Sequence, residues 1–152
     1  MRATVWTSLM TAAAAGVGSV VTDPESDWYR STEKPPWQPP PVAFPLVWTP
    51  LYVAIAYGTG RTVEKSRPEE RLGLLALTAA DLAANAAWSW AFFGRRSPAG
   101  GLAVIAVLDG LNAALVRRAA TVDRRAAAAL VPYAAWVGFA TVLNASIWRR
   151  NR

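Results

Sequence analysis

The tryptophans are the side chains of this sequence with the clearest chemical potential. Eight of them occur in 152 residues, whereas histidine and cysteine are both absent. An indole ring offers a large apolar face, and an aromatic pair contributes about 0.5–1.5 kcal/mol beyond the area that it buries. The absences exclude thiol chemistry, the commonest general base and the commonest metal ligand. The residue types therefore favour binding by stacking and burial; we expect no metal site, no obligatory cofactor and no conventional enzyme.

Two acids stand alone in otherwise apolar stretches. Asp81 is the one charged residue of 72–94, and Asp109 is the one charged residue of 97–116. An acid at the centre of a transmembrane helix costs about 2.5–3.5 kcal/mol on insertion scales. Asp81, Asn85 and Trp88 share a helix face, so Asp81 is expected to face a pocket or a polar interior. A carboxyl satisfied between helices and a ligand-binding role both stay open. Asp109 shares a face with Asn112, as at a helix–helix or dimer contact.

The elements that position these side chains are apolar runs of spanning length. Charged residues are absent from 3–22, 35–60 and 126–148. Together with the two stretches that contain a single acid, 72–94 and 97–116, they make five apolar segments. About 20 mainly apolar residues suffice to cross the hydrocarbon core of a bilayer. The sequence therefore predicts an all-α integral membrane bundle of five transmembrane helices in a single domain, residues 1–152. The expected helices cover about 3–22, 45–63, 70–93, 98–119 and 125–150.

The segment 23–44 is the one long polar connection. It contains six prolines, which cannot continue a helix and favour an extended path. Large aromatic residues are interleaved with the prolines, whereas a simple linker is more often rich in glycine and serine. We expect this segment to fold back onto the helix ends as a lid.

The net charge of +6 does not indicate nucleic-acid binding. The basic residues stand in small groups at helix ends, as headgroup anchors and topology signals do. Nine lie on the N-terminal side of the bundle and seven on the other, which favours a cytoplasmic N-terminus. Membrane lipid is therefore the expected surrounding, no nucleic-acid partner is expected, and the Ala/Arg-rich composition with short loops suits a bacterial inner membrane.

Four segments carry motifs in a fixed order. They are WY at 28–29 with KPPWQPP at 34–40, FPLVWTPLY at 44–52, NAAW at 85–88 with FFG at 92–94, and PYAAW at 132–136 with FAT, LN and WR up to 149. In order and spacing these motifs resemble the TspO/translocator-protein (TspO/MBR) family, bacterial members included. The resemblance extends from residue 28 to 151, whereas 3–22 and 98–119 match only in length and character.

The resemblance implies a function and a site. Members are five-helix membrane proteins, usually homodimers, that bind porphyrins such as protoporphyrin IX, and some bind cholesterol and benzodiazepine-type drugs. Their pocket lies between the helices under the first loop. By resemblance, the ligand-binding positions here are Tyr29, Trp37, Trp48, Asn85, Trp88, Phe92, Trp136 and Ala140. Periodicity alone would assign the helical tryptophans to packing; the resemblance favours binding.

A porphyrin is a flat, mostly apolar disc with two propionates at its edge. Indole faces would stack on the disc, and Arg30, Lys34 and the indole N–H of Trp37 are the expected donors to the propionates. Where Asp81 stands the family commonly has glutamine, so ligand choice is expected to differ. The proposed cholesterol motif has Ala145 in place of its tyrosine, which argues against tight sterol binding.

Three functions remain open from the sequence. The first is tetrapyrrole binding for transport, sensing or disposal. The second is light-dependent porphyrin degradation, with Trp48 and Trp136 as the photochemical, and in that sense catalytic, residues. The third is a small exporter, which is disfavoured because the intramembrane charges form no coupling chain.

Overall fold

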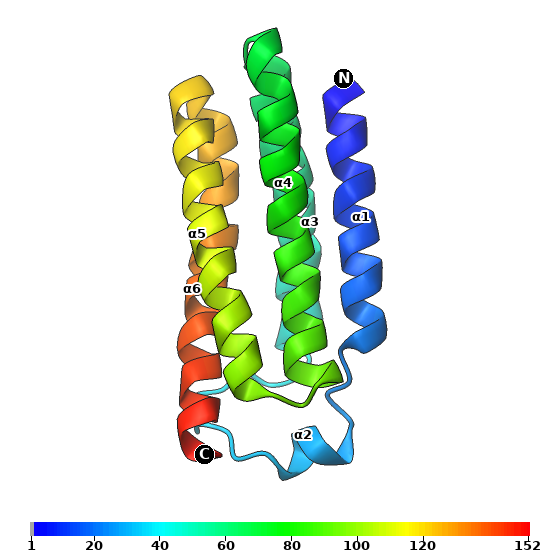
Figure 1. The fold of residues 1–152 in the computed structure, drawn as a ribbon, viewed down its shortest axis with the longest axis vertical. Helices are drawn as coiled ribbons and strands as arrows, with labels where there is room; N and C mark the ends of the chain where they lie inside the picture. Colours follow the sequence, from blue (N-terminus) through cyan, green and yellow to red (C-terminus); the bar gives the residue numbers. More distant parts are fainter. Residues whose placement is uncertain (1) are drawn as a thin grey trace.

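The computed structural model describes residues 2–152, and these form helices with no strand among them. The helices are α1 Arg2–Val21, α2 Asp27–Ser31, α3 Ala43–Lys65, α4 Pro68–Ser89, the π-helical segment η1 Trp90–Gly94, α5 Pro98–Val122 and α6 Arg124–Arg150. Figure 1 shows the long helices side by side in one elongated bundle, with the N-terminus at one end and the C-terminus at the other. The expected all-α class is confirmed.

Four of the long helices have the length and hydropathy of membrane spans, namely α1, α4 with η1, α5 and α6. The fifth long helix, α3, has 23 residues but does not reach the same hydropathy. Its stretch 43–60 carries no charge, yet it contains prolines, tyrosines, threonines and glycines, which lower the mean hydropathy. The count of five spans is therefore reduced to four on hydropathy alone.

The junction between α5 and α6 is held by one carboxylate. Asp123 Oδ1 accepts hydrogen bonds from the backbone N–H of Arg125 (2.8 Å) and Ala126 (3.1 Å), so the side chain caps α6. Its Oδ2 contacts Arg61 (3.0 Å) and Lys65 (2.7 Å) of α3. The hydrogen bonds from Arg61 and then Lys65 hold the pKa of Asp123 well below its usual range. This end of the bundle is therefore tied across three helices.

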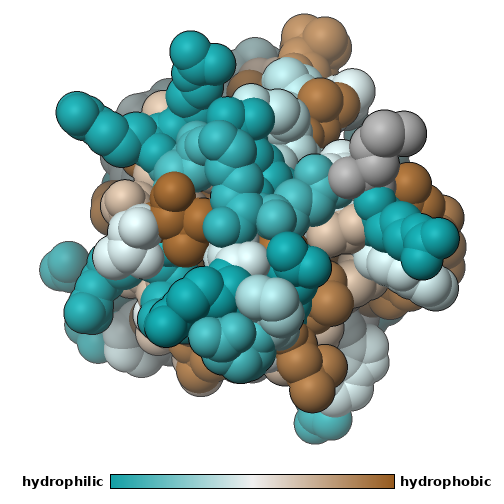
Figure 2. Space-filling model, turned by 90° about the horizontal axis from the view of Figure 1, so that it is seen from above, coloured by the Kyte–Doolittle hydropathy of each residue, from teal (hydrophilic) through white to brown (hydrophobic). Residues whose placement is uncertain are grey.

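Hydrophilic side chains gather over the same end, where the N-terminus and the α3–α4 and α5–α6 connections lie (Figure 2). At this end α1 and α3 approach closely, since a Cβ added to Gly60 would lie 2.7 Å from the Cα of Thr4. Thr7 Oγ1 also donates to the carbonyl of Ala56 at 2.9 Å. The two helices are therefore locked together at the end remote from the proline-rich segment.

The segment between α1 and α3 crosses the opposite end of the bundle (Figure 1). It contains the helix α2, which the sequence pattern did not predict. The hydroxyl of Ser26 caps this helix by accepting from the N–H of Tyr29 at 3.3 Å. The N–H of Glu33 donates to Asn151 Oδ1, and Asn151 Nδ2 donates to the carbonyl of Glu33, both at 2.9 Å. The segment is thereby attached to the end of α6. We call residues 23–42 the lid segment.

Candidate ligand-binding cavity

A cavity of about 670 Å³ lies between the helices beneath the lid segment. Ligand pockets in proteins commonly measure about 300–1,000 Å³. All the long helices and the lid segment contribute to its wall. Aromatic rings form much of that wall, and they are Tyr29, Phe44, Trp48, Tyr52, Trp88, Phe92, Phe93 and Trp136. The space is therefore suited to a flat apolar molecule of considerable size.

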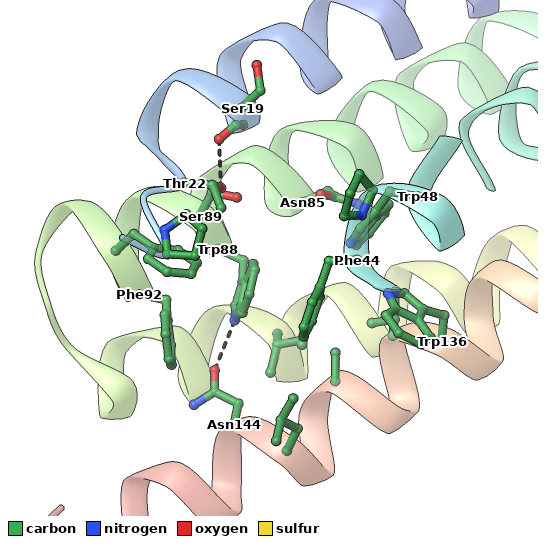
Figure 3. A pocket seen from close by; sticks show the side chains of 18 of the residues that line it. Ser19, Thr22, Phe44, Trp48, Asn85, Trp88, Ser89, Phe92, Trp136 and Asn144 are labelled. Atoms are coloured by element: carbon green, nitrogen blue, oxygen red, sulfur yellow. Dashed lines mark hydrogen bonds between the residues drawn. The ribbon is translucent and has the colours of Figure 1, made fainter. Parts of the chain in front are cut away.

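Three tryptophans point into the cavity from three different helices (Figure 3). Trp48 of α3 stacks on Tyr52 with ring centroids 5.2 Å apart and planes 30° apart. Trp88 of α4 stacks on Phe92 at 5.4 Å and 24°. Trp136 of α6 meets the edge of Phe44 at 6.1 Å. Each indole thus contacts at least one neighbouring ring, which helps to fix its plane.

The indole of Trp88 is also held by a hydrogen bond. Its Nε1 donates to Asn144 Oδ1 at 2.9 Å (Figure 3). Asn144 Nδ2 in turn donates to the carbonyl of Pro98 at 2.7 Å. Gly101 makes room for this arrangement, because an added Cβ would lie 2.8 Å from Asn144 Oδ1. The link joins α4, α6 and the start of α5, and it sets the direction of the Trp88 ring.

A chain of buried polar groups extends from the cavity into the bundle. Asn85, which lines the cavity, donates from Nδ2 to the hydroxyl of Tyr133 at 3.0 Å. Tyr133 in turn donates to Asp81 Oδ2 at 2.9 Å. Asp81 and Tyr133 are both 0% exposed, and neither lines the cavity. Helices α4 and α6 are therefore joined by polar side-chain contacts directly behind the cavity wall.

No charged side chain lines the cavity among residues 2–152. Its polar groups are neutral, and those at the lid end include Thr22 beside the lid segment and Tyr29 and Gln38 of the lid segment itself. Gln38 Nε2 donates to the Tyr29 hydroxyl at 3.1 Å. Burial raises the pKa of Tyr29, and the hydrogen bond from Gln38 offsets part of that rise. The lid end of the cavity therefore presents neutral hydrogen-bonding groups.

The cavity opens sideways between α1 and α3. Gly16 and Ser19 of α1 and Pro45 and Thr49 of α3 line it and are themselves exposed. A Cβ added to Gly16 would meet nothing within 4 Å. These exposed lining residues place the opening on the lateral surface of the bundle, near the lid segment.

Residues 6–149 match the TspO/MBR family, in agreement with the sequence motifs. The chain is 36% identical to the protein CrtK of Rhodobacter capsulatus over 141 residues, 91% of this chain and 87% of the relative. It is also 36% identical to the tryptophan-rich protein TspO of Chlorobaculum tepidum (88% and 86% covered) and to the bovine translocator protein (82% and 75% covered).

The chain belongs to the TspO/MBR family. Membership of TspO/MBR and four apolar helices together identify it as an integral membrane protein. Seven of the eight positions inferred from the TspO/MBR motifs line the cavity, and they are Tyr29, Trp48, Asn85, Trp88, Phe92, Trp136 and Ala140. The eighth, Trp37, does not line it. Trp37 is 47% exposed and meets the edge of Phe139 at 6.0 Å.

The expected donors to propionates also lie elsewhere. Arg30 is exposed and forms an ion pair with Glu25. Lys34 donates to the carbonyl of Thr32 at 2.8 Å and to that of Tyr29, so its ammonium group is engaged by the lid backbone. Burial lowers the pKa of Lys34. The sequence left two positions open for Asp81, one facing a pocket and one in a polar interior. Asp81 is fully buried and lies in the polar interior.

Other lining residues were not singled out from the sequence. Phe44, Tyr52 and Asn144 stand within the TspO/MBR motifs at 44–52 and 143–144, so the motifs offered a signal for them. Gly16 and Ser19 of α1 offered none, because small residues in an apolar helix have no distinctive chemistry. Asp109 accepts a hydrogen bond from Thr141 of α6 at 2.8 Å, which is a helix–helix contact.

Proposed function

We propose that this protein binds tetrapyrroles of the protoporphyrin IX type in the aromatic cavity. The observation that carries the proposal is the convergence of Trp48, Trp88 and Trp136 on one cavity. A rigid aromatic disc gains both burial of its faces and ring–ring contact there. The lateral opening between α1 and α3 gives an apolar ligand a route from the bilayer.

The propionates of such a ligand point towards the lid segment. The cavity wall offers them neutral donors rather than bases, and the hydroxyls of Thr22 and Tyr29 and the amide of Gln38 stand at that end. Neutral hydrogen bonds contribute about 0.5–1.5 kcal/mol each, so most of the affinity comes from the macrocycle. We therefore expect esterified and free-acid porphyrins to bind with similar affinity.

The biological setting follows from the family. Relatives are named translocator protein and, in Cereibacter sphaeroides, tryptophan-rich sensory protein, which supports a membrane transport or sensory role here. We place α3 as a fifth span, since it lies among the other long helices and its 23 residues extend about 35 Å. We further propose a homodimer in a bacterial inner membrane.

A dark titration of purified protein with protoporphyrin IX tests the proposal. Bound porphyrin is expected to quench tryptophan fluorescence saturably, at one pigment per chain, while the absorption of the pigment persists. The double variant Trp48→Phe, Trp136→Phe keeps aromatic rings in the wall and should bind with little change. A signal that rises without saturation, equal to that of protein-free micelles, would refute binding.

A second candidate is light-dependent pigment degradation, because Trp48 and Trp136 both face the space that the pigment would occupy. An excited porphyrin can take one electron from an indole and pass it to dioxygen; the oxidised indole then recovers an electron from the pigment, so that the pigment is oxidised, dioxygen is reduced and the indole is restored. Illumination of the complex in air should then bleach the pigment to a discrete product, and the double phenylalanine variant should abolish the bleaching. Equal bleaching in protein and variant would exclude the idea.

A further inference from the structure

Behind the cavity wall, four buried side chains from three helices meet around one hydroxyl. Tyr133 of α6 donates to Asp81 and accepts from Asn85, both of α4, and Asn112 of α5 also interacts with the Tyr133 hydroxyl. Asn112 is 2% exposed, and its Nδ2 donates to the carbonyl of Leu108 at 3.2 Å. Two atoms of this cluster, Asp81 Oδ1 and Asn112 Oδ1, have no hydrogen-bond partner among the described residues.

The surroundings of Asp81 offer no positive charge. Among residues 2–152, the titratable side chain in contact with Asp81 is Tyr133. Of the helices packed against α4, α1 carries no charge between 3 and 21, and the first charge of α3 is Arg61, which pairs with Asp123. On α5, Asp109 accepts from Thr141. An ionised carboxylate buried without a positively charged partner is strongly disfavoured and becomes neutral by taking a proton.

A proton on Asp81 would change the role of one of the two unpartnered atoms. Oδ2 already accepts from Tyr133, so the proton belongs on Oδ1, which then becomes a donor. Asn112 Oδ1 is the unused acceptor of the same cluster. A metal cation fits less well, since hard cations take about six oxygen ligands and Asn85 directs an N–H into the cluster.

We propose that Asp81 is a proton-binding site whose occupancy is coupled to ligand binding in the cavity through Asn85 and Tyr133. The coupling rests on the proposed function of the cavity. A ligand seated against Asn85 removes water from the one polar group that connects the cluster with the cavity, so the charged form of Asp81 is further disfavoured. Ligand and proton therefore bind together, and by linkage each strengthens the binding of the other.

The sign of the pH dependence follows directly. Affinity is greatest at low pH, where Asp81 already holds its proton, and it falls as pH rises and the free protein loses that proton. One linked proton limits the change to about tenfold in the dissociation constant per pH unit. Above the pH at which the complex itself deprotonates, affinity becomes constant again.

The experiment measures dark binding of protoporphyrin dimethyl ester, which has no ionisable propionate, from mildly acidic to alkaline pH. Asp81→Asn supplies the acceptor and donor of a neutral carboxyl without a titratable proton. It should bind at every pH with the affinity that the unaltered protein shows in acid. Asp109→Asn, the matched control at the other intramembrane acid, should retain the pH dependence. Calorimetry in buffers of different ionisation enthalpy should show proton uptake that Asp81→Asn abolishes.

Failure of this inference and failure of the proposed function give different results. Equal, pH-independent binding by the unaltered protein and Asp81→Asn would overturn the coupling and leave the binding function intact. Absence of binding at any pH would overturn the function and the coupling. Infrared spectra of the ligand-free proteins then decide the proton site alone: a carboxylic-acid carbonyl band that disappears in Asp81→Asn supports it, and its absence refutes it.

Discussion

Replacing Gly101 with alanine tests how the cavity wall is held. The added methyl would lie 2.8 Å from Asn144 Oδ1 and 3.0 Å from Cδ2 of Phe92. Asn144 must then move, and with it the acceptor of the Trp88 indole N–H. Gly110 on the same helix is the matched control, since an added Cβ there meets nothing within 4 Å.

The expected changes in the free energy of unfolding have opposite signs for the two substitutions. Overpacking costs about 1–3 kcal/mol, and loss of the Trp88–Asn144 hydrogen bond costs about 1 kcal/mol. Alanine's higher helix propensity returns roughly 1 kcal/mol. Gly101→Ala should therefore lower the free energy of unfolding by about 1–3 kcal/mol. Gly110→Ala gains the propensity without the clash and should raise it by about 0.5–1 kcal/mol.

Thermal unfolding midpoints in detergent, measured under identical conditions, give the order of stability of the unaltered protein, Gly101→Ala and Gly110→Ala. Pigment titration of the same samples should show weaker binding for Gly101→Ala, by about two- to tenfold if one ring contact is lost. If Gly101→Ala proves as stable as Gly110→Ala and binds normally, the hydrogen bond between Trp88 and Asn144 does not position the wall.

Three further predictions concern the cavity and its supports. Ala140→Phe fills part of the cavity and should weaken dark pigment binding by about tenfold, an overpacking cost of about 1.4 kcal/mol, with the fold kept by circular dichroism; unchanged affinity would place the ligand elsewhere. Asn144→Ala leaves the Trp88 N–H without its acceptor and should lower the free energy of unfolding by about 1–3 kcal/mol, measured with denaturant. In the double variant with Trp88→Phe, the loss should be smaller than the sum of the two single losses, because both remove the same hydrogen bond; additive losses would argue against the link. Asp123→Asn keeps an oxygen for the cap but removes the charge facing Arg61, so its unfolding midpoint should be lower at neutral pH. Because the native pKa of Asp123 is lowered, the ionised form stabilises the fold above the unfolded value of about 3.9; the difference from the unaltered protein should vanish in acid, and a constant difference would contradict this.

The helical bundle was predictable because apolar stretches of spanning length, with at most one charge each, have few alternatives in a bilayer. Within it, α3 differs from expectation because its aromatic and small residues line and pack the interior at a cost in hydropathy. The helix α2 was missed, since a five-residue turn that depends on the Ser26 cap leaves little trace beside six prolines. The π-helical segment η1 was likewise not predicted from the sequence.

The site was predictable in its residue types more than in its directions. The motifs gave Trp48, Trp88 and Trp136, whose positions on helices fix where they point. Trp37 and Lys34 lie on the lid segment, where the local backbone decides direction: Trp37 turns to Phe139, and Lys34 is bound by carbonyls of its own segment. The contribution of α1 depends on packing that no pattern of small residues reveals.

A structure of the protein crystallised with protoporphyrin IX in the dark tests the central claim most directly. The macrocycle should lie in the cavity between the indoles of Trp48, Trp88 and Trp136, with its propionate edge towards the lid segment. A pigment bound on the outer surface, with these three rings unmoved around an unoccupied space, would contradict the assignment.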